Sequence, residues 1–207
     1  SVIRESASDG VHILGDAAKV LIQDSNILSS QVNGIYVNGR YELTSPGTTQ
    51  VTVLRSRISG SGGVGIWADS VNDNGPEGGV IQVFSSSIVN AGSFGVFADN
   101  SNVDIGTDPN SAGSIGTTID TTGTIGVASL GISHVRIRES IIRNVVTGID
   151  STGSLAVPGG NASLIAEGNT ISVSGSGIAI TANYGDVPPT FIDANLSRNS
   201  IFAGADG

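Results

Sequence analysis

One phrase returns eight times along this chain of 207 residues: a small polar residue, an Ile two positions later, and a Gly six or seven positions after the Ile. The isoleucines are Ile3, Ile27, Ile58, Ile88, Ile119, Ile142, Ile171 and Ile201. The glycines that answer them are Gly10, Gly34, Gly65, Gly95, Gly126, Gly148, Gly177 and Gly207. A repeat spaced by 22 to 31 residues is typical of a solenoid, in which each repeat buries its apolar face only against its neighbours.

Each repeat contains two stretches in which buried and exposed positions alternate. In one copy these are Val51 with Val53, and Ile66 with Ala68 directly after Gly65. A period of two predicts strands with one buried face. We therefore expect each coil to hold two clear strands, a short extended turn around the Ile and a loop back. Stacked coils lie about 4.8 Å apart.

The repeats predict three inward ladders of apolar side chains. The first is the column of eight isoleucines. The second follows the glycines and comprises Val11, Ile35, Ile66, Val96, Val127, Ile149 and Ile178. The third has two residues in each coil: Val20 and Ile22, Val51 and Val53, Ile81 and Val83, Val103 and Ile105, Val135 and Ile137, Leu164 and Ala166.

A column of small polar residues precedes the Ile column by two positions. Its members are Ser1, Ser25, Ser56, Ser86, Thr117, Ser140, Asn169 and Asn199. Such residues, stacked at a bend, are expected to hydrogen-bond from coil to coil and to satisfy the backbone of the turn. The recurrent Gly is expected to provide either a positive φ or clearance where the chain enters the next strand.

Composition limits the partners that this chain can bind. A single lysine, Lys19, and eight arginines face 18 acidic residues, which gives a net charge of −9. This balance argues against nucleic acid and anionic membranes, and it makes a highly anionic polysaccharide a harder ligand unless a cation bridges the two. The absence of Cys excludes disulfides and thiolate zinc sites. No apolar run is long enough for membrane insertion.

The repeated pattern Asn/Ser-x-Ile followed by Gly-Ile/Val-x-Val covers the whole chain and resembles the right-handed parallel β-helix repeat of the pectate-lyase-like superfamily. The resemblance implies an all-β, right-handed parallel β-helix of about seven to eight coils, forming a single domain over residues 1–207. Both ends fall at nearly the same phase of the coil and neither shows a capping helix. We therefore expect a segment of a longer protein, or else end-to-end contact between uncapped coils.

The most distinctive surface feature lies two residues after each Gly, at an outward strand position. There the successive coils carry His12, Tyr36, Trp67, Phe97, Ala128, Asp150 and Ala179. The first four predict a strip of stacked rings that can bind sugar rings or a protein partner. The alternative is that cross-coil aromatic pairs stabilise the sheet and are covered by a loop.

Carboxylates adjoin this strip. Asn38, Asp69 and Asp99 stand four positions after their glycines, and like charges one coil apart repel by about 1 kcal/mol in water-like surroundings. Compensation can come from Ca²⁺, from an Arg or from divergence into solvent. The following loop adds oxygen donors at Asp73, Asn74 and Glu77. Asp69, Asp99 and Asp73 are thus weak candidates for a calcium site, and solvated turn residues are the favoured reading because no calcium-loop motif is present.

Many members of the superfamily cleave polysaccharides, but their signatures are missing here. Neither the Trp-Ile-Asp-His block of pectate lyases nor their Arg-x-Pro-x-x-Arg segment occurs. Of the polygalacturonase motifs, only Arg136-Ile137-Arg138 gives a loose match. Asp69 and Asp99 remain an alternative catalytic pair that would flank a glycosidic bond.

Other charged residues are read as structural. The arginines cluster as Arg55 with Arg57, and as Arg136 with Arg138 and Arg143. We expect them to be solvated or paired with Asp24 and Glu139, and an anion site is the lesser alternative. His134 is interpreted as structural because no Ser or Asp pattern around it suggests a nucleophile.

These observations favour a non-catalytic, extracellular or cell-surface module that acts as a spacer and as a glycan- or protein-binding face, with Tyr36, Trp67, Phe97 and His12 as contact residues. The polar, Cys-free, Lys-poor composition resembles that of exported bacterial surface proteins, and the repeats resemble those of β-helical adhesins. The alternatives are a polysaccharide lyase or glycoside hydrolase, and a purely structural stalk. No cofactor is expected other than Ca²⁺.

Overall fold

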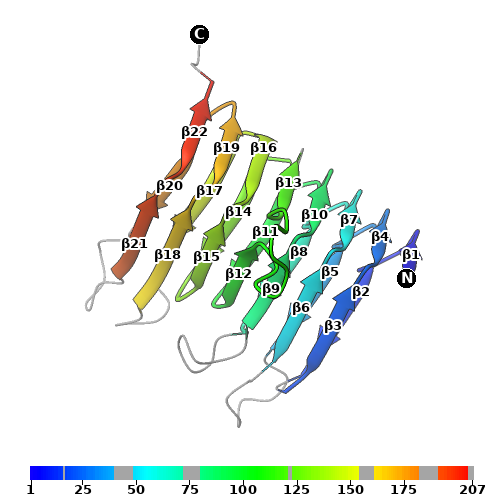
Figure 1. Ribbon diagram of the computed structural model, residues 1–207. Helices are drawn as coiled ribbons and strands as arrows, with labels where there is room; N and C mark the ends of the chain where they lie inside the picture. The colour runs from blue at the N-terminus through cyan, green and yellow to red at the C-terminus, as the bar shows by residue number, and fades with distance from the viewer. Residues whose placement is uncertain are drawn as a thin grey trace.

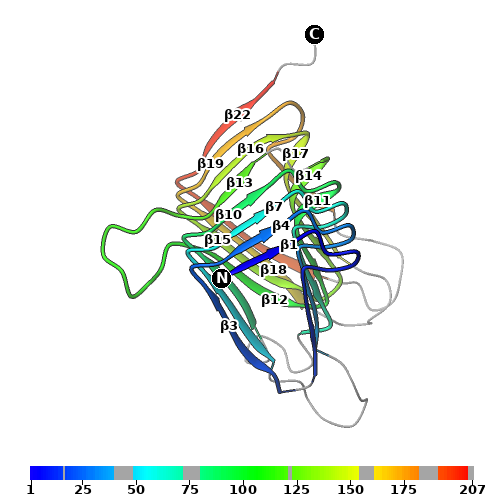
Figure 2. The same cartoon turned by 90° about the vertical axis from the view of Figure 1, so that its right-hand side faces the viewer.

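The computed structural model describes residues 1–15, 17–39, 49–71, 80–120, 123–153, 161–181 and 191–204. Over these residues the chain forms 22 strands and no helix. The strands build three parallel sheets, and the coils follow one another from the N-terminal to the C-terminal end of the stack (Figures 1 and 2). The prediction of an all-β parallel solenoid is confirmed.

Each coil contributes one strand to each sheet, so neighbours within a sheet are three strands apart in sequence. Sheet A consists of β1 (Val2–Arg4), β4 (Asn26–Leu28), β7 (Arg57–Ser59), β10 (Ser87–Val89), β13 (Thr118–Asp120), β16 (Ile141–Val145), β19 (Thr170–Val173) and β22 (Ser200–Ala203). Sheet B consists of β2 (Val11–Leu14), β5 (Ile35–Asn38), β8 (Ile66–Asp69), β11 (Phe94–Asp99), β14 (Ile125–Leu130), β17 (Thr147–Thr152) and β20 (Ile178–Thr181). Sheet C consists of β3 (Lys19–Gln23), β6 (Gln50–Leu54), β9 (Val80–Phe84), β12 (Asn102–Gly106), β15 (His134–Arg138), β18 (Asn161–Glu167) and β21 (Phe191–Ser197).

All three predicted ladders are in register, and they form the core except at the two ends of the stack, where Ile3 and Ile201 are exposed. The eight isoleucines of the first ladder face one another across every pair of strands in sheet A. The short turn expected around each Ile is a true strand, so the solenoid has three sheets where the sequence indicated two clear strands per coil. The third ladder also continues one coil further than predicted, to Ala194 and Leu196 of β21.

The column of small polar residues that precedes the Ile column forms hydrogen bonds between adjacent coils, as predicted. The backbone N–H of Ser25 donates to Ser56 Oγ at 3.1 Å, and that of Ser56 donates to Ser86 Oγ at 3.1 Å. Further along, Ser140 N donates to Asn169 Oδ1 at 2.9 Å, and Asn169 N donates to Asn199 Oδ1 at 3.0 Å. Each side chain thus accepts the turn N–H of the preceding coil, which is otherwise a buried donor with no ladder partner.

The recurrent glycines provide clearance. A Cβ on Gly126 would lie 2.5 Å from Ile142 Cγ2 and 2.6 Å from the carbonyl oxygen of Gly148, both in the next coil. Positive φ values are found instead at the corners between sheets, for example at Asp24 (48°) between sheets C and A and at Ser70 (53°) after a strand of sheet B. The Gly and Ile columns therefore recur together because each Ile methyl occupies the space that the Gly of the preceding coil leaves open.

Candidate functional site

Four rings form a continuous column on the outer face of sheet B. His12, Tyr36, Trp67 and Phe97 occupy the same register position on β2, β5, β8 and β11. Their ring centroids are separated by 4.9 Å, 5.3 Å and 5.7 Å in turn. We call these four residues the aromatic strip. The next rung is Ala128, a small and buried residue, so the strip ends at Phe97.

The rings contact one another mainly by their edges. The planes of His12 and Tyr36 make an angle of 87°, and those of Tyr36 and Trp67 an angle of 67°. Phe94 adds a stacked contact to Phe97, with centroids 5.2 Å apart. Such pairs stabilise a sheet beyond the area they bury. The Tyr36, Trp67 and Phe97 side chains are nevertheless only half-buried, and that of His12 is 45% exposed, so the strip also presents ring surface to solvent.

A polar column runs beside the strip, two residues further along each strand. Asn38, Asp69 and Asp99 are register partners on β5, β8 and β11. The Tyr36 hydroxyl donates to Asp69 Oδ2 at 2.9 Å, and Asn38 Nδ2 donates to the Tyr36 hydroxyl at 3.2 Å. Ser70 Oγ donates to Asp69 Oδ1 at 2.9 Å. Hydrogen-bond donors therefore compensate the charge of Asp69.

Asp99 is held differently. Its Oδ1 accepts a hydrogen bond from Asn100 Nδ2 at 2.9 Å. Partial burial, and secondarily the negative charge of Asp69, raise the pKa of the Asp99 carboxyl above its ordinary value of 3.8. At the other end of the strip, the Asp9 carboxylate lies 3.0 Å from Nδ1 of His12. The outer face of sheet B thus combines aromatic rings with carboxylates.

The raised pKa of Asp99 has a consequence for stability that can be tested. The folded state binds this proton more tightly than the unfolded state, so the contribution of Asp99 to stability falls as the pH rises from about 3.8 through the folded-state pKa. We expect the free energy of unfolding of Asp99→Asn, relative to the natural chain, to increase with pH over this window. Urea unfolding at a series of pH values measures it. Asp193→Asn, which removes an exposed carboxylate from sheet C, is the control. A difference that stays constant with pH would contradict the assignment.

The calcium prediction receives no further support. Among the described residues there is no group of three or more His, Cys, Asp or Glu side chains that could hold a metal ion. Asp73, the third weak candidate, lies outside the described residues, as do Asn74 and Glu77. The register places Asp69 and Asp99 side by side, as predicted. Calcium binding itself stays a prediction.

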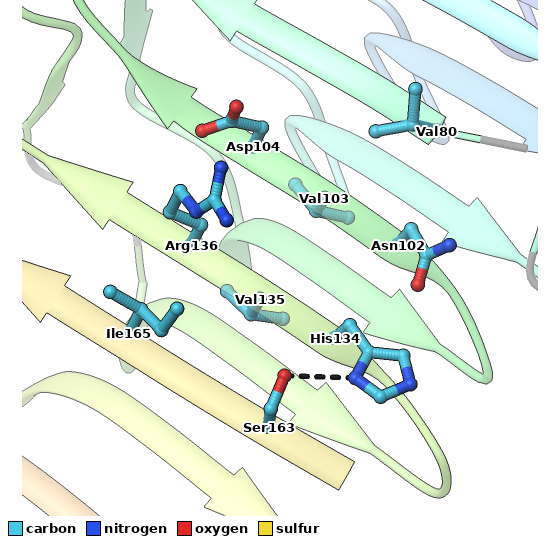
Figure 3. Close-up of a pocket in the computed structure, with 9 residues that line it drawn as sticks. All are labelled: Val80, Asn102, Val103, Asp104, His134, Val135, Arg136, Ser163 and Ile165. Carbon is cyan, nitrogen blue, oxygen red and sulfur yellow. Dashed lines mark hydrogen bonds between the residues drawn. The ribbon is translucent and has the colours of Figure 1, made fainter. Parts of the chain in front are cut away.

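A hollow of about 180 Å³ lies on the outer face of sheet C (Figure 3). It is lined by Val80, Asn102, Val103, Asp104, His134, Val135, Arg136, Ser163 and Ile165. Within it, His134 Nδ1 and Ser163 Oγ are 2.8 Å apart, and burial lowers the pKa of His134 below its ordinary value. No motif in the sequence predicts this pair, although its separation of 29 residues is one repeat length.

The arginines are paired mostly along neighbouring coils. Arg55 binds Asp24 at 2.9 Å, as predicted. Arg138 binds Asp104 of the preceding coil at 3.2 Å rather than its neighbour Glu139, which accepts a hydrogen bond from Thr107. Asp104 is the register partner of Arg136, and Arg138 lies two residues further along the same strand, so its side chain reaches Asp104 diagonally on one face of sheet C.

No helix in the described part of the chain has the length and apolar character needed to cross a membrane. Comparisons with protein-family models, with curated proteins and with solved structures gave no match.

Proposed function

We propose that this chain is a non-catalytic, extracellular β-solenoid module that acts as a rigid spacer and binds a glycan through the aromatic strip. One observation carries the proposal: four rings, partly exposed and one rung apart, lie beside a parallel column of hydrogen-bonding groups. Because of the repeat pattern, we also propose that the chain is related to the pectate-lyase-like superfamily and, within it, to adhesin segments.

The chemistry of the face fits a sugar. Aromatic rings bind the apolar C–H surface of a pyranose, while amide and carboxylate oxygens accept hydrogen bonds from its hydroxyl groups. Asn38, Asp69 and Asp99 supply such groups at the same rise per coil as the rings. The buried Trp67 Nε1 has no hydrogen-bond acceptor among the described residues, so a small shift of the indole would add a donor.

A glycoside hydrolase is the second candidate. Asp69 and Asp99 are neighbours across two strands, and the raised pKa of Asp99 favours the protonated form that a general acid needs. Under this alternative, Asp99→Asn abolishes hydrolysis of a bound oligosaccharide. Under the binding proposal, neither the natural chain nor this variant releases reducing sugar.

Replacing Trp67 with Ala is expected to weaken glycan binding at least tenfold, because truncating a central aromatic hot spot costs about 2 kcal/mol or more, and about 1.4 kcal/mol corresponds to a factor of ten. A glycan array identifies the ligands, and titration calorimetry measures the affinity. Phe202→Ala is the matched control, since Phe202 is an aromatic residue on sheet A with 62% of its surface exposed.

Near-ultraviolet circular dichroism and the unfolding midpoint establish that both variants are folded. Equal losses in the two variants would place the site elsewhere. Absence of binding to any glycan would overturn the proposal in favour of a structural stalk, and binding to a protein ligand that depends on Trp67 would replace the glycan with a protein partner.

A further inference from the structure

We infer that the glycan is a linear, β-linked polymer of amino sugars, bound in its positively charged form with its chain along the solenoid axis and one sugar ring on each rung of the aromatic strip. This inference rests on the proposed function and adds the direction, the length and the charge of the ligand.

The direction follows from the spacing of the rings. Successive centroids in the strip are 4.9 Å, 5.3 Å and 5.7 Å apart. An extended β-linked pyranose chain advances by nearly the same length per ring, so it can place each sugar against one aromatic side chain. A helical or strongly bent polymer cannot maintain this match over consecutive rungs.

The length follows from where the strip ends. Beyond Phe97 the same register position holds the buried Ala128 and then Asp150. Neither offers an aromatic surface. Four rungs therefore define four sugar positions, and units added beyond the fourth gain no ring contact.

The charge of the ligand follows from the charges on sheet B. Its strands carry Asp69, Asp99 and Asp150 but no Arg or Lys, within the ranges given above for β2 to β20. Asp9 adds a carboxylate next to His12. The net charge of the chain is −9. Ammonium groups repeated along a polymer can therefore pair with Asp69 and Asp99, whereas an anionic polymer meets like charge at both positions.

The hydrogen bonds of Asp69 and Asp99 support this arrangement. Asp69 accepts hydrogen bonds from two hydroxyl groups, those of Tyr36 and Ser70. The carboxylate of Asp99 accepts one side-chain bond within the described residues, from Asn100 to Oδ1. Its other oxygen is the position at which a sugar ammonium would bind, and the two negative charges one rung apart make a cation there favourable.

The test is calorimetry at mildly acidic pH with β-1,4-linked glucosamine oligomers of increasing length, with the fully N-acetylated hexasaccharide, and with a hexasaccharide of uronic acids. Affinity is expected to rise up to the tetrasaccharide and then to level off. The glucosamine hexasaccharide is expected to bind at least tenfold more tightly than its N-acetylated form, and added salt to reduce this advantage.

Two isosteric variants locate the charge. Asp99→Asn keeps an oxygen that accepts hydrogen bonds from sugar hydroxyl groups but loses the charge, so it is expected to lower the ratio of the affinities for the glucosamine and the N-acetylated hexasaccharide at least fivefold. Asp193→Asn removes the same charge from an exposed position on sheet C and is expected to change neither affinity.

The outcomes separate the inference from the proposed function. Trp67-dependent binding of N-acetylated or acidic oligomers that equals or exceeds binding of the amino form would overturn the charge, with the glycan proposal intact. Affinity that keeps rising beyond the tetrasaccharide would overturn the placement of one sugar per rung. Lack of Trp67-dependent binding by every oligomer would overturn both.

Discussion

Replacing Gly126 with Ala is expected to lower the free energy of unfolding by about 3 kcal/mol, the upper end of what overpacking of a core costs. The added methyl would lie 2.5 Å from Ile142 Cγ2 and 2.6 Å from the carbonyl oxygen of Gly148. The Ile142 side chain is fully buried between Ile119 and Ile171 of the adjacent coils, so it cannot move aside. The Gly148 carbonyl could move away only if the two coils separated. Urea unfolding followed by far-ultraviolet circular dichroism measures the effect.

Gly113→Ala distinguishes steric clearance from backbone strain. Gly113 has a φ of +76° and no atom within 4 Å of the position of an added Cβ. Its substitution is therefore expected to cost about 1 kcal/mol, from the left-handed conformation alone. Equal losses in the two variants would show that clearance against the Ile column is not the reason for glycine at position 126.

Replacing Asn169 with Leu is expected to cost about 3 kcal/mol, because it removes a buried side chain that connects three coils. Asn169 Oδ1 accepts the Ser140 N–H at 2.9 Å, while Nδ2 donates to the Ile137 carbonyl and to Asn199 Oδ1, each at 2.9 Å. The Asn169 residue is 1% exposed, so water cannot replace these partners. The unfolding midpoint in urea again gives the loss.

The column itself supplies the control for this substitution. Ser56 and Ser86 occupy the equivalent position in other coils and accept the same backbone N–H through their hydroxyl groups. Asn169→Ser is therefore expected to cost about 1 kcal/mol, because only the donor side of the amide is lost. If Ser were as damaging as Leu, the volume of the side chain rather than its hydrogen bonds would be responsible.

The sequence predicted the ladders well because each depends on one residue type at one phase of the repeat. Ile58, Val51 and Ile66 take inward positions in one coil, and the same phase of the neighbouring repeats again holds Ile or Val. Contacts between coils were harder to foresee. A second polar column, in which Val71 N donates to Ser101 Oγ and Ser101 N to Ser133 Oγ, was missed because it extends over only a few coils.

The candidate site was predictable to the same degree. The order of the aromatic strip and the adjacency of Asp69 and Asp99 followed from register alone. The register partner of Tyr36 is Trp67, but the Tyr36 hydroxyl donates to Asp69, two residues further along the neighbouring strand. It depends on the reach of the phenol and on the rotamers of both residues, which spacing in sequence does not specify.

The match between each Gly and the Ile of the following coil also bears on how such a chain can change in length. Gly126 faces Ile142, and Gly148 faces Ile171. Loss of one complete coil would bring Gly126 against Ile171 and recreate the same contact, whereas loss of a single residue within a strand would turn the remaining side chains of that strand to the opposite face. Solenoids of this kind are thus expected to lengthen and shorten in whole coils, so that related chains differ mainly in their number of coils.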